Sequence, residues 1–176
     1  MLLVACSNSI VVMQEEIFPI VNAEGEVIGS ATRTECHAGT FILHPVVHLH
    51  IFNSKGDLYL QKRVMTKKIQ PGKWDTAVGG HVDYGEKIEE ALLREAREEL
   101  GVRDFVPEFL MRYEFRSQVE FELVYIYKCV YNGEFNPDPS EVSDGRFWAW
   151  NEIRENIGKG VFTPNFESEI LKLGWI

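Results

Sequence analysis

The chain has 176 residues, of which 45% are hydrophobic, and it carries a formal net charge of −9 with a pI of about 5.1. This length suits one domain, and the apolar content is enough for a core. The acidic balance argues against binding to a nucleic acid polymer, because proteins that bind phosphate backbones usually show a basic surface.

Three cysteines, Cys6, Cys36 and Cys129, are odd in number and show no CxxC spacing. That pattern favours a reducing compartment, of which the cytoplasm is the simplest. No apolar run approaches the roughly 20 residues that a membrane-spanning helix needs, so no membrane partner is expected. We expect residues 1–16 to form a loosely ordered N-terminal segment and residues 17–176 to form a single domain.

Two hairpins open the predicted order of elements, each with a polar turn that contains glycine. Short strands and one long helix follow, and two short helices end the chain. Strands mixed with few helices predict an α+β fold in which helices pack on a mixed sheet. The predicted strands are 18–21, 27–30, 46–52, 58–61, 74–79, 109–115, 119–130 and 147–150, and the predicted helices are 86–100, 151–157 and 167–173.

The long helix is the clearest of these elements. Ile88, Leu92, Ala96 and Leu100 recur every four residues and form an apolar stripe that can pack on a sheet. Gly101 then provides a C-terminal stop, since glycine readily adopts positive φ.

Three glutamates of this helix, Glu95, Glu98 and Glu99, fall within an arc of about 100°. Carboxylates one turn apart repel each other by roughly a few tenths of a kcal/mol on an open helix surface, so the cluster needs a counter-charge. Arg94 is one candidate. A divalent cation such as Mg²⁺ or Mn²⁺ is the better one, because these ions prefer oxygen ligands. The alternative is a solvated acidic face without a metal.

The spacing around the helix matches a family signature. Gly80 is followed by five residues and Glu86, then by seven residues and the run from Arg94 to Val102. This pattern resembles the signature of the Nudix family of diphosphate hydrolases, with every fixed position filled. The resemblance implies an α/β/α sandwich with a mixed sheet between helices. It also implies a metal-dependent reaction in which water attacks a phosphorus of a diphosphate linkage.

The same resemblance implies roles for individual residues. Glu98 and Glu99 are expected to be the principal metal ligands, and Glu95 a further ligand or the base that activates water. Arg94 is expected to orient these carboxylates, and the carbonyl of Gly80 to be another ligand.

A basic region precedes the signature. Six of the chain's 18 basic residues lie within residues 55–73, where they could steer an anionic substrate. A solvated loop is the alternative for most of them. Arg63 and Lys67 fit positions that are often basic in the family and, together with Glu86, which helps to hold the loop, they are predicted to border the substrate. The six residues are Lys55, Lys62, Arg63, Lys67, Lys68 and Lys73.

A second resemblance covers about residues 17–150. An N-terminal hairpin, two spaced histidines, a Phe52-Asn53 turn and a Gly80-His81 pair look like type 1 isopentenyl diphosphate isomerase and the hydrolases close to it. In the isomerases, three histidines and two glutamates hold a transition metal, and Mn, Zn or Fe suits such ligands. Polar core residues are the alternative. The matching residues are His37, His44, His81, Glu120 and Glu122.

The two glutamates allow another interpretation. Glu120 and Glu122 alternate along a predicted strand and so should share one of its faces. Either of them could instead supply the extra carboxylate that hydrolases often bring from outside the signature.

One position separates the two activities. Isomerases use a cysteine just before the Gly-His pair to protonate an alkene, and that position is Gly79 here. None of the three cysteines lies in this loop, and the hydrolytic signature is intact. We therefore expect hydrolysis of a nucleoside diphosphate derivative, or of another small or isoprenoid diphosphate. An isomerase and a non-catalytic binding module are the alternatives. Many family members are dimers, so a homodimer is one candidate assembly.

Overall fold

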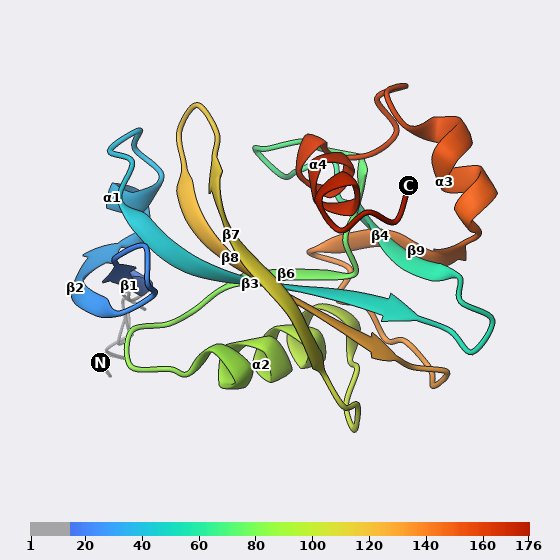
Figure 1. The fold of residues 1–176 in the computed structure, drawn as a ribbon, viewed down its shortest axis with the longest axis horizontal. Coiled ribbons are helices and arrows are strands. Elements are labelled where there is room, and N and C mark those ends of the chain that lie inside the picture. Colours follow the sequence, from blue (N-terminus) through green and yellow to red (C-terminus); the bar gives the residue numbers. More distant parts are fainter. Residues whose placement is uncertain (1–14) are drawn as a thin grey trace, which may run out of the picture.

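The computed structural model describes residues 15–176, and at its centre lies a seven-stranded mixed sheet with helices on both faces (Figure 1). The loosely ordered segment expected at residues 1–16 falls almost entirely on residues outside this range. The strands are β1 (Ile17–Val21), β2 (Val27–Thr32), β3 (Leu43–Phe52), β4 (Leu58–Arg63), β5 (Trp74–Asp75), β6 (Val78–His81), β7 (Glu108–Arg116), β8 (Phe121–Val130) and β9 (Val142–Trp148). The helices are α1 (Arg33–Cys36), α2 (Ile88–Leu100), α3 (Trp150–Asn156) and α4 (Pro164–Lys172).

Strand β3 organises the sheet. It pairs in parallel with β8 over its whole length, and β7 continues the sheet beyond β8 in antiparallel. The other edge of β3 is divided between two partners. β6 pairs with Val46–Leu49, whereas β4 pairs only with Ile51 and Phe52 and then continues to β5 and β9. β4 and β6 therefore follow one another along the same edge of β3 without pairing to each other.

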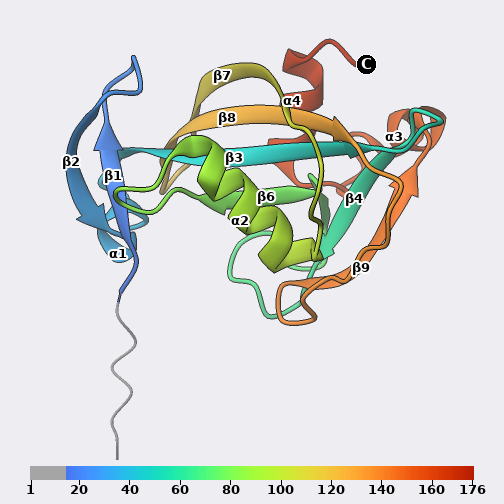
Figure 2. The ribbon, with the colours of Figure 1, turned by 90° about the horizontal axis from the view of Figure 1, so that it is seen from below.

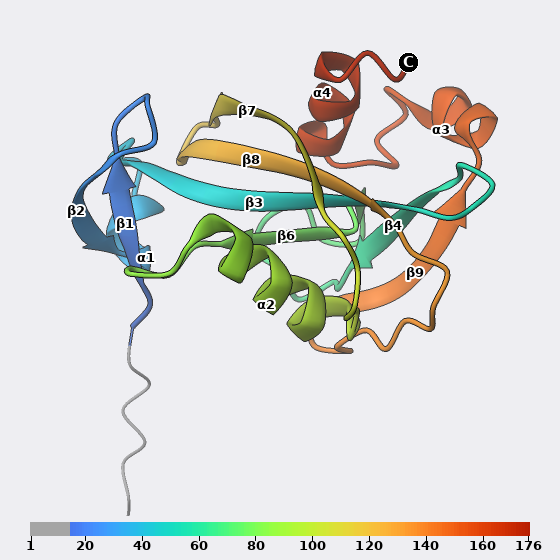
Figure 3. The same cartoon turned by 60° about the horizontal axis from the view of Figure 1, so that its bottom comes forward.

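The two faces of the sheet are covered by different helices, with α2 on one side and α3 and α4 on the other (Figure 3). Side chains alternate along β3 as the pleat requires. Val47, Leu49 and Ile51 pack in the core against α2. Val46 lies in a separate cluster that includes Leu173, just after α4. This arrangement confirms the predicted α/β/α sandwich with a mixed sheet.

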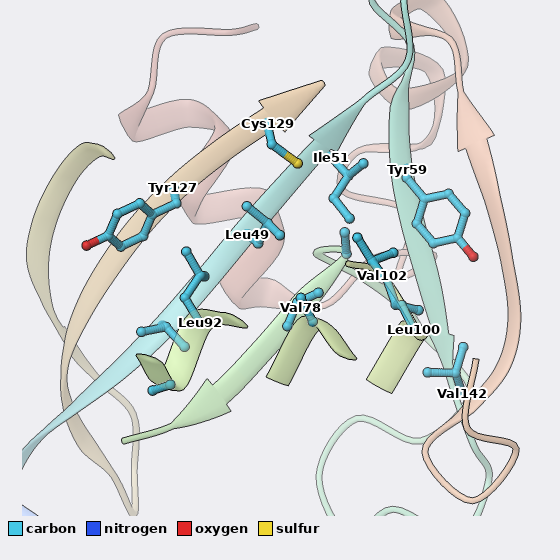
Figure 4. Packing of buried hydrophobic residues seen from close by; sticks show 14 of the residues in the cluster. Leu49, Ile51, Tyr59, Val78, Leu92, Leu100, Val102, Tyr127, Cys129 and Val142 are labelled. Atoms are coloured by element: carbon cyan, nitrogen blue, oxygen red, sulfur yellow. The ribbon is translucent and has the colours of Figure 1, made fainter. Parts of the chain in front are cut away.

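Helix α2 crosses beneath the sheet (Figure 2) and buries the predicted apolar stripe. Leu92, Ala96 and Leu100 are fully buried, and Ile88 packs against the same cluster. Figure 4 shows Leu92 and Leu100 among the buried side chains of this cluster. Burying one leucine side chain contributes about 2 kcal/mol, so this stripe fixes the rotation of the helix about its axis. Gly101 ends the helix with φ of 66°, as predicted. The stripe therefore also determines which residues of α2 face away from the core.

Several predicted boundaries are wrong for physical reasons. The single strand predicted at 74–79 is two strands, because the chain leaves β4 at Asp75 and joins β3 at Val78. Glu120 lies before β8, which begins at Phe121, so it does not share a strand face with Glu122.

The predicted final strand at 147–150 starts earlier, at Val142, since its polar residues face outward and hide the pattern. The predicted helix at 167–173 starts at Pro164, where the Thr163 side chain caps the backbone N–H of Phe166.

A small hairpin and helix at the N-terminal side of the sheet were only partly predicted. β1 and β2 pair with each other, and the four-residue helix α1 follows directly. A capping box of Thr32 and Glu35 was the overlooked sequence signal for α1. Phe18, Ala31 and Cys36 form a core of their own, which sets His37 beside the start of β3. In the part of the chain described, no helix has the length and apolar character needed to cross a membrane.

Candidate functional site

Arg94 of α2 ties the loop before the helix to the helix itself. Its Nε and Nη2 atoms donate to the two carboxylate oxygens of Glu86, both at 2.9 Å, and Nη2 also donates to the carbonyl oxygen of His81 at 2.9 Å. The Asp83 backbone N–H donates to Glu86 as well, at 3.1 Å. Such a bidentate pair has a fixed geometry. The carboxylate of Glu86, predicted to border the substrate and to hold the loop, is thus used in holding the loop.

Arg94 also contacts the glutamates that follow it. Its Nη1 donates to Glu95 at 2.7 Å and to Glu98 at 3.4 Å. Glu95 lies directly against β6, where a Cβ added to Gly80 would come within 2.0 Å of the Glu95 carboxyl carbon. Glycine is therefore required at position 80, because any side chain would displace Glu95.

Glu99 connects the two strands that divide the edge of β3. One of its carboxylate oxygens accepts hydrogen bonds from the side chain of Gln61 on β4 at 3.0 Å and from the backbone N–H of Gly79 on β6 at 3.3 Å. Burial, together with the nearby Glu95, raises the pKa of Glu99 to about 8. Burial also raises the pKa of Glu95. We refer to Glu95, Glu98 and Glu99 as the acidic edge.

The acidic edge carries more negative charge than its neighbours compensate. Glu98 is the outermost member, with 52% of its side chain exposed, and it meets Arg94 and Arg97 only at 3.4 and 3.5 Å. Arg94 is shared with Glu86 and Glu95. Partly buried carboxylates with raised pKa values and oxygen donors in close proximity are a typical environment for a divalent cation.

A second group, which we call the histidine pocket, consists of His37, His44 and His81. One ring nitrogen of each lies within 4.8 Å of those of the other two. Nδ1 of His37 donates to the carbonyl of Arg33 at 2.7 Å, and Nδ1 of His44 donates to the carbonyl of Ile42 at 2.9 Å. These bonds leave Nε2 as the remaining ligand atom of each ring, which is the arrangement that metal-binding histidines adopt.

Two members of the histidine pocket, His44 and His81, have ring nitrogens that are shielded from solvent. Nε2 of His44 and Nε2 of His81 are buried without a hydrogen-bond partner. Phe18 stacks on His81 with ring centroids 4.4 Å apart and an interplanar angle of 3°. Burial lowers the pKa of His44 and lowers that of His81 well below its ordinary value. Neutral imidazoles with unpaired nitrogens meet the chemical requirements of a transition-metal site.

The two glutamates predicted to join the histidines are placed differently. An oxygen of Glu120 lies 3.4 Å from Nε2 of His37. Glu122 is buried within β8, where burial and the charge of Glu120 raise its pKa to about 7. In the described part of the chain, the mutually close set contains only the three histidines, and neither glutamate belongs to it.

The two basic residues predicted to bind substrate each have an acidic partner. Arg63 lies 3.4 Å from Asp75 and also donates to the carbonyl of Ile69 at 3.2 Å. Lys67 pairs with Glu141. Gln61, which holds Glu99, was not predicted, because nothing near it in the chain indicates a contact with α2.

These features define a class of protein. It is an α/β/α sandwich in which the helix that carries the acidic edge packs on one face of a mixed sheet, close to Gly80. The sequence profile of the NUDIX domain matches residues 42–166, and the chain belongs to the Nudix family.

Known relatives refine this placement. Over 149 residues the chain is 33% identical to an isopentenyl-diphosphate Delta-isomerase of Shigella boydii, covering 81% of this chain and 80% of that one. Another such isomerase, from Escherichia coli O1:K1, is 38% identical over 96 residues, covering 54% of this chain and 53% of that one. The crystal structure of DR0079 from Deinococcus radiodurans superposes with a TM-score of 0.77 at 26% identity, covering 90% of this chain and 99% of that one.

Proposed function

We propose that this protein is a metal-dependent hydrolase that cleaves a diphosphate linkage by attack of water at phosphorus. The main support is the acidic edge, where Glu95 and Glu98 share one cation, Arg94, and Glu99 is held beside β6 by neutral donors only. Such an excess of carboxylate oxygens fits Mg²⁺ or Mn²⁺. When bound, a metal of this kind neutralises phosphate oxygens and lowers the pKa of the attacking water.

The residues of the chain have distinct parts in this proposal. Glu98 and Glu99 are the principal ligands, Glu95 is a further ligand or the base, and the carbonyl of Gly80 completes the set. Arg94 orients Glu95 and Glu98 through its hydrogen bonds. The contacts from Gln61 and Gly79 hold Glu99 at the gap between β4 and β6.

Hydrolysis is favoured over isomerisation, although named relatives are isomerases. Position 79 is glycine and offers no thiol. Cys36 and Cys129 are buried, and burial raises their pKa values to about 11 and about 12. Thiols of this kind are unreactive. Cys6 lies outside the described residues.

We also propose that the histidine pocket holds a transition metal such as Mn, Zn or Fe, with Glu120 as the nearest carboxylate. The orphaned Nε2 atoms of His44 and His81 support this proposal. Glu122 is a candidate for either metal group, since its carboxylate is buried in β8 two residues after Glu120.

The substrate is proposed to be a small diphosphate, with a nucleoside diphosphate derivative first and an isoprenoid diphosphate second. The isoprenoid option rests on the isomerase relatives. Arg63 and Lys67 remain proposed substrate contacts. Arg63 would then bind the substrate while it is also paired with Asp75, and Lys67 while it is also paired with Glu141. A cytoplasmic location and a homodimer stay predictions.

The direct test measures phosphate or pyrophosphate release from a panel of diphosphates with Mg²⁺ and with Mn²⁺. The panel contains nucleoside diphosphates and triphosphates, nucleotide sugars, dinucleotides and isopentenyl diphosphate. We expect metal-dependent release by the wild type and none by a folded Glu98→Gln variant. Double-bond migration without release would favour the isomerase. Full activity of Glu98→Gln would refute the site assignment.

A further inference from the structure

A second charged network lies on the face of the sheet opposite α2, and its centre is Glu169. This residue of α4 is fully buried. One carboxylate oxygen accepts from Nδ1 of His48 at 2.7 Å and from the hydroxyl of Tyr113 at 3.1 Å. The other accepts from Nε2 of His50 at 2.5 Å. A buried carboxylate with three donors is held rigidly by α4, β3 and β7.

The two histidines on Glu169 have different surroundings. His50 is fully buried, its other nitrogen lies 3.3 Å from the hydroxyl of Thr76, and Trp175 packs against its ring. Both nitrogens of His50 are therefore used inside the protein. His48 uses only Nδ1, and 12% of its side chain is exposed. Its Nε2 has no hydrogen-bond partner among the described residues.

The free nitrogen of His48 lies beside Gly79 of β6, the strand that borders the acidic edge. A Cβ on Gly79 would lie 3.4 and 3.5 Å from Cδ2 and Nε2 of His48. The backbone N–H of the same Gly79 donates to Glu99. A single residue of β6 thus separates the His48 ring from the acidic edge. Because Gly79 has no side chain, nothing at this position covers the ring.

The network keeps His48 positively charged. Burial alone would lower its pKa, but Glu169 outweighs burial and raises the pKa to about 9. The charged or titratable groups that act on His48 come from every neighbouring element. They are Glu169 of α4, Glu122 of β8, Asp75 of β5, His81 of β6, and, through the shared carboxylate, Tyr113 of β7 and His50 of β3.

We propose that His48 is a further catalytic residue whose imidazolium, fixed by Glu169, donates a hydrogen bond from Nε2 to a phosphate oxygen of the substrate. It would act from the side of β6 opposite the acidic edge, so that the diphosphate meets a cation as well as the metal-binding carboxylates. A preorganised cationic donor stabilises the charge that develops on phosphate oxygens during the reaction. The inference rests on the proposed function in that it requires a diphosphate ligand. Glu169 is a positioning residue.

The test compares His48→Gln with His50→Gln, since each removes one imidazole from Glu169 but only His48 faces the site. The probe is imidodiphosphate with Mg²⁺, whose binding is measured by calorimetry. We expect His48→Gln to weaken binding by about tenfold or more, as for other hydrogen bonds to charged groups, and His50→Gln to weaken it far less. In turnover of a diphosphate, His48→Gln should lower kcat/KM by about 100-fold. Equal effects of the two variants would overturn the inference.

A second measurement on the wild type covers the case in which His48→Gln does not fold. The side-chain ¹⁵N resonances of the histidines are recorded with and without imidodiphosphate and Mg²⁺. A shift of Nε2 of His48 larger than that of His50 supports the contact, and no shift of His48 overturns it. Glu169→Gln should reduce this shift, which a merely structural role would not require.

The outcomes separate the two proposals. If the wild type binds imidodiphosphate through His48 but releases phosphate from no diphosphate, the hydrolase is wrong and the contact stands. If the wild type hydrolyses a diphosphate and His48→Gln is as active, the hydrolase stands and the contact is wrong.

Discussion

The acidic edge and the histidine pocket hold their candidate ligands by opposite means. In the acidic edge, Arg94 positions Glu95 and Glu98, neutral donors hold Glu99, and the carboxylates repel one another in a partly buried place. The histidine pocket is positioned by backbone carbonyls and by stacking on Phe18, and burial lowers the pKa of His44 and His81. The first group needs a cation to relieve repulsion, whereas the second is already arranged without one. The two groups should therefore respond differently to mutation and to metals.

The largest expected effect comes from Glu99→Gln. Turnover should fall by about 10³-fold, because the proposed metal ligand loses its charge. The metal-free protein should nevertheless melt a few degrees higher, since a buried carboxylate with a raised pKa destabilises the fold at neutral pH. Thermal melting and phosphate release on the same sample test both claims.

A matched control for Glu99→Gln lies on the same helix. Glu90 caps the first turn of α2 by accepting from the backbone N–H of Lys87 at 3.2 Å, and glutamine can make the same bond. Glu90→Gln should keep wild-type turnover. A lower melting temperature for metal-free Glu99→Gln would show that the acidic edge is not under electrostatic strain.

The next effect concerns the choice of metal. Mn²⁺ or Zn²⁺ should raise the melting temperature of the wild type by several degrees, because a ligand at about 100 times its Kd adds about 2.7 kcal/mol. His44→Gln should lose the Zn²⁺-induced shift but keep the Mg²⁺-induced one, and Glu99→Gln should show the reverse. Each shift is measured against the variant's own metal-free melting temperature. One variant that loses both shifts would mean that the two groups form a single site.

A smaller effect separates two adjacent glycines. Gly80→Ala should cost about 1–3 kcal/mol of stability and reduce turnover, because its Cβ would lie 2.0 Å from the Glu95 carboxyl carbon. Gly79→Ala should be much milder in stability, since its Cβ would be in ordinary contact with His48 at 3.4 Å. Chemical denaturation of both variants measures the difference. Equal destabilisation would contradict the close approach of Glu95 to β6.

The contrast between the two groups also explains what could be predicted from sequence. The acidic edge is local, so the spacing of Glu95, Glu98 and Glu99 on one helix placed them together in advance. The apolar stripe that ends at Leu100 fixed which side of α2 faces the sheet. The proximity of His37, His44 and His81 was predicted from a resemblance, and the structure brings the three rings together.

Long-range contacts could not be predicted from the sequence. Gln61 meets Glu99 across 38 positions and His48 meets Glu169 across 121, and neither pair has a local pattern. Glu169 lies on an amphipathic helix, where a charged residue is normally taken as exposed. Its burial depends on three donors from two other elements, β3 and β7. The misplaced Glu120 has the same origin, since the start of β8 is set by its pairing with β3 at Leu43.

The last expected effect is a pH dependence carried by the network around Glu169. The pKa of His48 is raised from its ordinary 6.5 to about 9 in the folded protein, so its contribution to stability is fully present below about 6.5 and is lost as pH rises through about 9. The contribution is on the order of 3 kcal/mol. Denaturation of the metal-free wild type at pH 6 and at pH 10 should show this loss, and His48→Gln should lack it. An equal loss of stability in both proteins would assign the pH dependence to other groups. His48 would then be uncharged near neutrality. In that case no imidazolium would lie on the face of β6 opposite the acidic edge.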